Sequence, residues 1–587
     1  MSDATLTPAL APVDAEVVRA VNGVLLPGFT GTDTLPAWLD QAARAGLAGV
    51  VLFGHNTPDV ATTARLTAHL HDASPDLLVA IDEEGGDVSR LEAATGSSLP
   101  GNAALGVVDD VAVTEDVGAA LGRLLTATGV DLDLAPDLDV NSDPDNPVIG
   151  VRSFGADPAL VARHGAAFVR GLHAGGAGAC GKHFPGHGAT NVDSHLALPV
   201  VDASLAELRV RELPPFVATM TPGGSSGAGA GAGADDDVRL DAVMTAHVVV
   251  PALGPLPATL EPAVGALVRE LGYDGPIVTD ALDMGAVAAY AETGPSETGA
   301  EGVPTHGIGE VAVRAIEAGA DLLCLGTTVG RDDEALFRQA QVALVSAVAS
   351  GRLPLDRLRA SAAHTATART AIRTRQAASG IVPSPESAAT ALDTLERVGS
   401  DVAARAVRFA DPAPGPGPVL TAAPDVVDLR LRFDHAAGRT AQHVQRAFDD
   451  AFGTGVRHLR PTDAAAWTHA FDAVRSSDRP LVVLTREPVP GSDERGRLDA
   501  LLADRPDAVV VHTGFPGAVA QWFGRGADET VPVGAVPDGV ARPVVVVACG
   551  TGRANARAAV ALLTGARWSS EAAGRGAFAS DTEGEEH

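Results

Sequence analysis

The chain has 587 residues, of which 46% are hydrophobic and 20% charged, and its formal net charge is −31. This length fits more than one globular domain, and we expect two, while the composition excludes an intrinsically disordered chain. The excess of acidic residues argues against a nucleic-acid partner, which binds a basic face, and no apolar run reaches the roughly 18 residues of a membrane-spanning helix.

The first residues, MSDATLTPALAPVDAEVV, lack the basic start and the continuous apolar stretch of a secretory signal. The cysteines Cys180, Cys324 and Cys549 are scattered and lack metal-type spacing, so we expect them to be reduced core residues. Both features favour a cytoplasmic protein.

Short apolar runs alternate with helical segments in the first part of the chain. The eight runs are 21–29, 47–54, 76–86, 130–140, 177–188, 240–250, 275–284 and 319–326. The helical segments between them include 116–129, 160–176 and 262–272, and each closes on glycine, as helix C-termini tend to do. Eight strands alternating with helices predict an N-terminal (β/α)8 TIM-like barrel.

Polar and ionisable residues collect at the C-terminal ends of these runs, where the chemistry of a barrel is found. They are Asp82, Asp137, Lys182, His183, His247 and Asp280. The pattern therefore favours both the barrel and an enzyme.

The rest of the chain predicts a smaller unit. Low-complexity residues 222–237 and the segment 292–307 interrupt the barrel pattern; we expect disorder in the first and leave open whether the second is a lid. A helical connector over 332–380 leads to four apolar runs, 419–431, 480–486, 508–514 and 543–550, which predict a C-terminal parallel α/β sandwich domain. The expected division is a catalytic barrel with its connector (1–380), the α/β sandwich domain (381–568) and a disordered tail (569–587).

One lysine stands out. Of the 43 basic residues, only Lys182 is not an arginine. Arginine can replace lysine on a solvated surface, whereas a compact point charge in a tight site is not interchangeable with a planar guanidinium. Lys182 is either a chance survivor of biased codon usage or a residue that a buried site requires.

The densest polar cluster is GKHFPGHGATNVDSH, residues 181–195. Its glycines and proline predict a loop that leaves the fifth strand. Within it, the Asp193 carboxylate could accept a hydrogen bond from one nitrogen of His195 and leave the other nitrogen for proton transfer. The alternative is an uncoupled surface pair.

Asp280 closes the seventh run, IVTDALDM. A carboxylate at the end of a barrel strand points into the barrel mouth and could act as a nucleophile. The alternative is a helix N-cap. Asp283, three residues on, is expected to lie in the following helix.

Taken together, KHFPGHG followed by DSH, IDEEGG with Arg90, IGVRSF, and TDALDM before GIGEVAVRAIEAGADLL resemble glycoside hydrolase family 3, in its β-N-acetylglucosaminidase branch. The motifs run in the family's order. One departure is Asp87 in IDEEGGDVSR, where the family usually shows a basic residue.

The resemblance implies roles for matching residues. Asp280 would be the nucleophile, and His195, oriented by Asp193, the acid/base catalyst. The residues implied in sugar binding are Asp82, Arg90, Arg152, Lys182 and His183. No metal and no cofactor are implied. The expected substrate is a small glycoside or disaccharide, derived from muropeptides or chitin during cell-wall recycling.

The acceptor is left open. A retaining hydrolase that releases terminal β-linked N-acetylglucosamine is the first expectation, with water attacking a covalent glycosyl-aspartate intermediate. A neutral imidazole would not repel a phosphate dianion as a carboxylate base would. The alternative is therefore a phosphorylase that uses inorganic phosphate and releases N-acetylglucosamine 1-phosphate.

Three alternative hypotheses from other functional classes remain. A metal hydrolase would use His183, His187, Asp193 and His195. Against it, the segment HFPGH contains a proline and would therefore not hold its two histidines on one helical face. A Schiff-base aldolase would use Lys182 as a nucleophile. A non-catalytic sugar-binding protein would leave Asp280 and His195 without a role.

Overall fold

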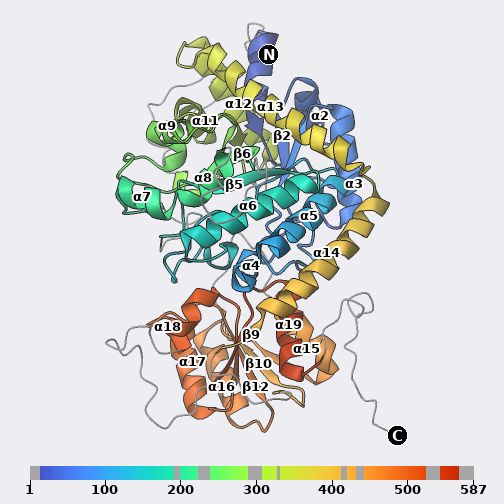
Figure 1. Cartoon of the computed structure of the whole chain (residues 1–587), viewed down its shortest axis with the longest axis vertical. Coiled ribbons are helices and arrows are strands. Elements are labelled where there is room, and N and C mark those ends of the chain that lie inside the picture. The colour runs from blue at the N-terminus through green and yellow to red at the C-terminus, as the bar shows by residue number, and fades with distance from the viewer. Residues whose placement is uncertain are drawn as a thin grey trace, which may run out of the picture.

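The structure is a computed structural model that describes residues 14–190, 198–221, 238–287, 307–326, 331–410, 419–430, 442–523 and 543–566. The predicted interruption at 222–237, the candidate lid at 292–307 except Gly307, and the predicted tail at 569–587 lie outside these residues. Two units lie one above the other, with the N-terminal unit at the top of Figure 1.

Each of the eight predicted runs in the N-terminal unit contains a strand. The strands are β1 (Leu25–Leu26), β2 (Gly49–Leu52), β3 (Leu78–Ile81), β4 (Leu132–Asp133), β5 (Gly178–Phe184), β6 (Ala242–Thr245), β7 (Ile277–Thr279) and β8 (Leu323–Cys324). Within the described residues, β2 to β7 form a parallel sheet in chain order, and β1 pairs with β8, also in parallel.

Backbone hydrogen bonds join these two groups of strands. The amide of Val51 donates to the carbonyl of Pro27 (3.0 Å), which links β2 to the end of β1, and the amide of Thr279 donates to Leu322 (3.0 Å), which links β7 to β8. The parallel sheet is therefore curled, and its order is consistent with the predicted (β/α)8 barrel.

The inside of the curled sheet is a single apolar cluster to which every strand contributes. Its members include Leu26, Val51, Ala80, Leu132, Cys180, Met244, Val278 and Cys324. Among the described residues the three cysteines are free and buried, as predicted. The interior is a packed core rather than a channel, so a site for chemistry has to lie at one end of the strands.

Helices surround the curled sheet. They are α1 (Ala15–Asn22), α2 (Ala37–Arg44), α3 (Val60–Ala73), α4 (Asn102–Val108), α5 (Val111–Ala127), α6 (Pro158–Ala174), α7 (Leu205–Arg211), α8 (Pro214–Met220), α9 (Pro262–Glu270), α11 (Ile308–Glu317), α12 (Asp333–Ala349), α13 (Leu355–Ser379) and α14 (Pro385–Ala406). The helical segments predicted between the strands correspond to α5, α6 and α9, and the predicted connector contains α12 and α13.

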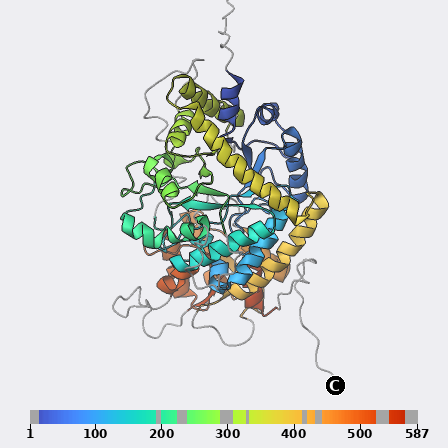
Figure 2. The ribbon, with the colours of Figure 1, turned by 45° about the horizontal axis from the view of Figure 1, so that its top comes forward.

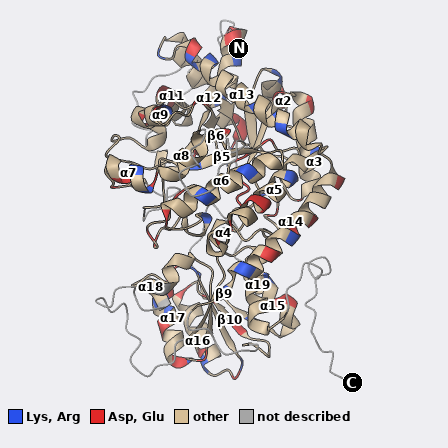
Figure 3. Cartoon of the chain, in the orientation of Figure 1, with Lys and Arg blue, Asp and Glu red and all other residues tan. Residues whose placement is uncertain are grey.

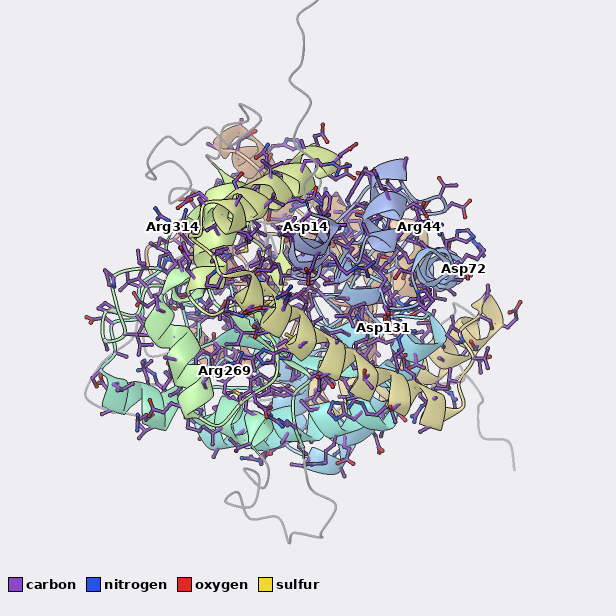
Figure 4. All side chains as sticks on the ribbon, turned by 90° about the horizontal axis from the view of Figure 1, so that it is seen from above. Asp14, Arg44, Asp72, Asp131, Arg269 and Arg314 are labelled. Carbon is purple, nitrogen blue, oxygen red and sulfur yellow. The ribbon has the colours of Figure 1, made fainter. Side chains whose placement is uncertain are left out.

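The amino ends of the strands are covered by α13, which runs across the N-terminal unit in Figures 2 and 4. Its Ile372 belongs to the interior cluster. Its arginines pair with carboxylates that precede β4, β6 and β8, namely Arg373 with Asp131 (3.2 Å), Arg375 with Asp241 (2.6 Å) and Arg357 with Asp321 (3.0 Å). The carboxyl ends of the strands face away from this helix.

The C-terminal unit contains a second sheet. Its strands are β9 (Arg408–Phe409), β10 (Asp425–Asp428), β11 (Arg457–Leu459), β12 (Leu481–Thr485), β13 (Val509–His512) and β14 (Val544–Val547). Within the described residues their order is β11-β10-β12-β13-β14-β9. Each of the four predicted runs supplies one strand. The prediction of an all-parallel sheet is wrong at one edge, because β9 is antiparallel to β14.

Helices cover both faces of this sheet (Figure 1). They are α15 (His443–Phe452), α16 (Ala464–Arg475), α17 (Asp493–Asp504), α18 (Val519–Phe523) and α19 (Arg553–Thr564). Successive side chains of β12 point to opposite faces: Val482 joins the apolar cluster of α15 and α19, and Val483 joins that of α16 and α17.

The helix α14 packs against α3 and α5 of the N-terminal unit and also against α19 of the C-terminal unit. The domain boundary after residue 380 stays a prediction.

Acidic and basic residues are interspersed along the helices on the face that Figure 3 shows. Among the described residues, no helix is both long and apolar enough to cross a membrane.

Candidate active site

The carboxyl end of the curled sheet carries the polar residues that the sequence singled out. Asp82 directly follows β3, Lys182 and His183 lie in β5, and Asp280 directly follows β7. Four of the predicted sugar-binding side chains, those of Asp82, Arg90, Lys182 and Arg152, lie in one connected network of charges.

Lys182 is the centre of this network. Its Nζ donates to Asp82 Oδ1 (2.7 Å) and lies 2.6 Å from Glu84 Oε1, and only 2% of its side chain is exposed. Burial alone would lower the pKa of Lys182, but the two carboxylates outweigh it and hold the pKa above its ordinary value. The ammonium is therefore a fixed positive charge at neutral pH, which supports the reading of Lys182 as a residue that a buried site requires.

Glu84 is a member of the network that the sequence analysis missed. It receives two hydrogen bonds from Arg152, from Nε (2.9 Å) and from the terminal NH2 nitrogen (2.7 Å), in addition to its contact with Lys182. Burial would raise the pKa of Glu84, but Arg152 and Lys182 hold it well below its ordinary value. Its position two residues after Asp82 in IDEEGG was the available signal, because alternate residues of an extended segment share a face.

Asp82 carries the exposed edge of the network. Burial would raise its pKa, but Lys182 and then Arg90 outweigh burial and lower the pKa below its ordinary value. The side chains of Asp82 and Arg90 are 19% and 16% exposed, and their charged atoms lie 3.6 Å apart. An ionised carboxylate beside a guanidinium at the mouth of the curled sheet can bind sugar hydroxyls as both acceptor and donor.

His183 is held by a residue that was also missed, Asp139. The Nδ1 atom of His183 lies 2.7 Å from Asp139 Oδ2, and its Nε2 faces the NH2 nitrogen of Arg152 at 3.3 Å. Burial and Arg152 lower the pKa of His183 to about 4. The imidazole is neutral at physiological pH, and its two nitrogens link Asp139 to Arg152 at the edge of the network.

The segment expected to be a loop from residue 181 begins as strand, because β5 runs through Phe184. Glycine at 181 reflects close packing rather than a turn, since a side chain there would meet Leu138 and Leu240 at 2.6 Å. The described loop starts after β5, where His187 Nδ1 contacts Thr190 Oγ1 (2.8 Å). Burial lowers the pKa of His187 to about 3, so this imidazole is also neutral.

Asp280 lies at the same end of the sheet. Its Oδ1 accepts a hydrogen bond from the amide of Ala281 (2.7 Å), and its charge is close enough to His183 to act on the pKa of that imidazole. His247, two residues after the end of β6, supports this turn through a contact of 3.0 Å between its Nε2 and the carbonyl of Ala281.

The prediction that the neighbouring Asp283 lies in a helix is wrong. Asp283 lies in the turn that follows β7, where it pairs with Arg331 at 3.0 Å. The turn is held from outside by this ion pair, which a local sequence pattern does not reveal. The predicted pair Asp193 and His195 lies outside the described residues.

Two rival chemistries can be weighed against this geometry. Asp137, Asp139 and His183 place one ligand atom each within 4.8 Å of one another. Burial, followed by the charge of Asp139, raises the pKa of Asp137 well above its ordinary value, and His183 is already hydrogen-bonded to Asp139. His183 is thus already engaged within this cluster. The ligand set predicted for a metal hydrolase, His183, His187, Asp193 and His195, stays a prediction because Asp193 and His195 lie outside the described residues. A Schiff-base role for Lys182 would need a neutral amine, which the two adjacent carboxylates oppose.

Known proteins similar to this chain were found by sequence and by structure. Beta-hexosaminidase A of Pseudoalteromonas piscicida is 32% identical over 365 residues, which are 57% of this chain and 56% of that protein. The chain thus spans little more than half the length of that relative. The Beta-hexosaminidase of Stenotrophomonas maltophilia (strain R551-3) is 34% identical over 358 residues, which are 58% of this chain and 96% of that protein.

A solved glycoside hydrolase family 3 beta-N-acetylglucosaminidase from Paenibacillus sp. str. FPU-7 superposes with a TM-score of 0.71 and 28% identity, over 95% of this chain and 97% of that one. The family model described as "Glycosyl hydrolase family 3 N terminal domain" matches residues 26–368, more than half of the chain. The charged network and Asp280 all fall within this match. The protein thus belongs to glycosyl hydrolase family 3.

Proposed function

We propose that this enzyme is a retaining, exo-acting β-N-acetylglucosaminidase that releases terminal β-linked N-acetylglucosamine from small glycosides. The observation that carries the proposal is the position of Asp280 at the end of β7, at the same end of the curled sheet as the network of Lys182, Asp82 and Glu84. The relatives named beta-hexosaminidase and beta-N-acetylglucosaminidase support this choice of sugar.

The proposed reaction has two steps. Asp280 attacks the anomeric carbon and forms a covalent glycosyl-aspartate, while protonated His195 donates its proton to the leaving oxygen. Neutral His195 then removes a proton from water, which attacks the same carbon and releases Asp280. Asp193 accepts a hydrogen bond from the other nitrogen of His195 and keeps the ring in position.

The charged network is proposed to bind the sugar during both steps. Asp82 and Arg90 hold hydroxyl groups at the mouth, and Lys182, His183 and Arg152 complete the pocket. Because these charges are paired before substrate arrives, they need no reorganisation when charge develops on the sugar. No metal or cofactor takes part in the proposed reaction, and the expected partner is a small glycoside or disaccharide.

The alternative is phosphorolysis of the same substrates. The proton acceptor in DSH is an imidazole rather than a carboxylate, so an incoming phosphate dianion would meet no negative base. Hydrolysis is preferred because the relatives carry the name of hydrolases.

The role of His195 is tested with two substrates that differ in their leaving group. His195→Ala should lower kcat/KM for N,N′-diacetylchitobiose by about 100-fold or more, because its sugar leaving group needs a proton. The same change should lower kcat/KM for 4-nitrophenyl N-acetyl-β-glucosaminide far less, because nitrophenolate leaves unprotonated. Steady-state kinetics of both substrates give the ratio.

Asp193→Asn is the matched variant, since it keeps the size of the side chain and removes the carboxylate that orients the imidazole. It should show the same leaving-group dependence with smaller losses. Equal losses on both substrates would remove His195 from the role of proton donor.

A further inference from the structure

The loop between β3 and α4 carries sugar-binding residues on one side and contacts the C-terminal unit on the other. Asp82 and Arg90 flank a tight turn in which Gly85 and Gly86 have positive φ angles of 78° and 61°. The turn is closed by a hydrogen bond from the amide of Val88 to the carbonyl of Gly85 (3.2 Å). Asp87 therefore lies at the tip of the loop.

The side chain of Asp87 is fully buried, and the residues that hold it come from the C-terminal unit. Arg486, which follows β12, donates to Asp87 Oδ2 at 2.5 Å. Thr551, which follows β14, donates to Oδ1 from its amide (2.6 Å) and from its hydroxyl (2.9 Å). Three hydrogen bonds, one of them from a guanidinium, thus fix the tip of the loop.

Further contacts join the rest of the loop to helix α19 of the C-terminal unit. Arg553 pairs with the buried Glu92 at 2.7 Å. The amide of Ala554 donates to the carbonyl of Ser97 (3.1 Å), and Asn555 donates to that of Pro100 (3.1 Å). The carboxyl edge of an open parallel α/β sheet is the usual place for a ligand. Here that edge holds the loop of the N-terminal unit.

The loop can transmit the position of its tip to the sugar-binding residues. Glu83 Oε2 accepts hydrogen bonds from the amides of Arg90 and Leu91, both at 2.8 Å, and so ties the two arms of the loop together. A shift of the tip therefore moves Asp82 and Arg90 as one piece.

The charge at position 87 fits this arrangement. The family that the motifs resemble usually has a basic residue there, and a basic residue would be repelled by Arg486 at the observed distance. An acidic residue at 87 together with arginine at 486 makes a buried pair, and breaking such a pair is costly because one charge is left buried and uncompensated. The pair links the two units at the loop that carries Asp82.

We propose that Arg486 and Thr551 are positioning residues. Through Asp87 they hold the loop so that Asp82 and Arg90 lie where they bind the sugar. Through these two residues the C-terminal unit contributes to the geometry of the binding site. The sugar-binding role of Asp82 and Arg90 rests on the proposed function. The part of the inference that concerns how Arg486 and Thr551 hold the loop does not rest on it.

The test compares Arg486→Ala with a matched control, Arg457→Ala. Arg457 pairs with the buried Asp425 at the same distance of 2.5 Å, but at the amino end of β10. Arg486→Ala should raise KM for 4-nitrophenyl N-acetyl-β-glucosaminide at least about tenfold and change kcat less than about threefold, because it disturbs binding rather than chemistry. Arg457→Ala should change neither.

Asp87→Asn, which keeps the shape of the side chain, should give a smaller rise in KM. The double variant Asp87→Asn with Arg486→Ala should be no worse than Arg486→Ala alone, because both changes remove one interaction. Arg486→Lys, which keeps the charge, should recover part of the KM even if Arg486→Ala folds poorly.

Amide hydrogen exchange supplies a readout that does not depend on activity. Peptides from 82–101 should exchange at least about tenfold faster in Arg486→Ala than in the wild type, and should be unchanged in Arg457→Ala. If KM and the exchange of this loop respond equally in both variants, or in neither, the inference is wrong. If the wild type fails to cleave the glycoside, the proposed function is wrong, and exchange still decides whether Arg486 holds the loop.

Discussion

Asp280→Ala is expected to lower kcat/KM for every glycoside by about 10,000-fold or more, because without the carboxylate no covalent intermediate forms. The loss should be the same for good and poor leaving groups, since the nucleophile acts on the sugar and not on the leaving oxygen. Initial rates with 4-nitrophenyl N-acetyl-β-glucosaminide and N,N′-diacetylchitobiose measure it. Unchanged thermal unfolding would show that the loss is chemical.

Asp283→Asn is the matched control for this change. Asp283 lies three residues after Asp280 on the same turn, but its carboxylate pairs with Arg331 (3.0 Å). It should keep kcat/KM within a few-fold of the wild type. A loss in Asp283→Asn as large as that in Asp280→Ala would contradict the assignment of the nucleophile.

Lys182→Met is expected to damage both stability and activity. Removal of the ammonium leaves the buried Glu84 with one cationic partner fewer and Asp82 beside it, which costs about 3–5 kcal/mol for a broken buried pair. The catalytic efficiency should fall by about 100-fold or more because Asp82 is no longer held. Urea unfolding and kcat/KM measure the two effects.

Lys182→Arg should not rescue the loss, although it keeps the charge. The planar guanidinium is larger than an ammonium, and Arg152 already occupies the other side of Glu84. A matched control is Arg170→Met on α6, whose partner Glu115 is 44% exposed and whose ion pair should contribute little. Wild-type stability and activity in Lys182→Met would show that the single lysine is incidental.

Much of the N-terminal fold could be predicted from the sequence because buried parallel strands are short apolar runs and several of the helices between them, such as α5, α6 and α9, are followed by glycine. The shortest strands of the C-terminal unit could not. The edge strand β11 reads RHL, and β9 has two residues, so neither gives an apolar run. The direction of β9 depends on its pairing with β14, which lies far along the chain.

The candidate site was predictable where a residue type and a strand end coincide. Lys182 and Asp280 both stood out for this reason. Glu84 and Asp139 were missed because an acidic residue that follows a strand has the same local sequence whether water or a buried cationic group surrounds its side chain. The partner of Asp87 is 399 residues away in the chain, and no local pattern reveals such a contact.

We propose that this family 3 enzyme transfers N-acetylglucosamine from a β-glycoside to water. The most direct measurement is the identity of the sugar product from 4-nitrophenyl N-acetyl-β-glucosaminide, with and without millimolar inorganic phosphate. We predict free N-acetylglucosamine at the same rate in both. Formation of N-acetylglucosamine 1-phosphate at a phosphate-dependent rate would contradict hydrolysis and assign a phosphorylase, and no release in either condition would contradict the sugar specificity itself.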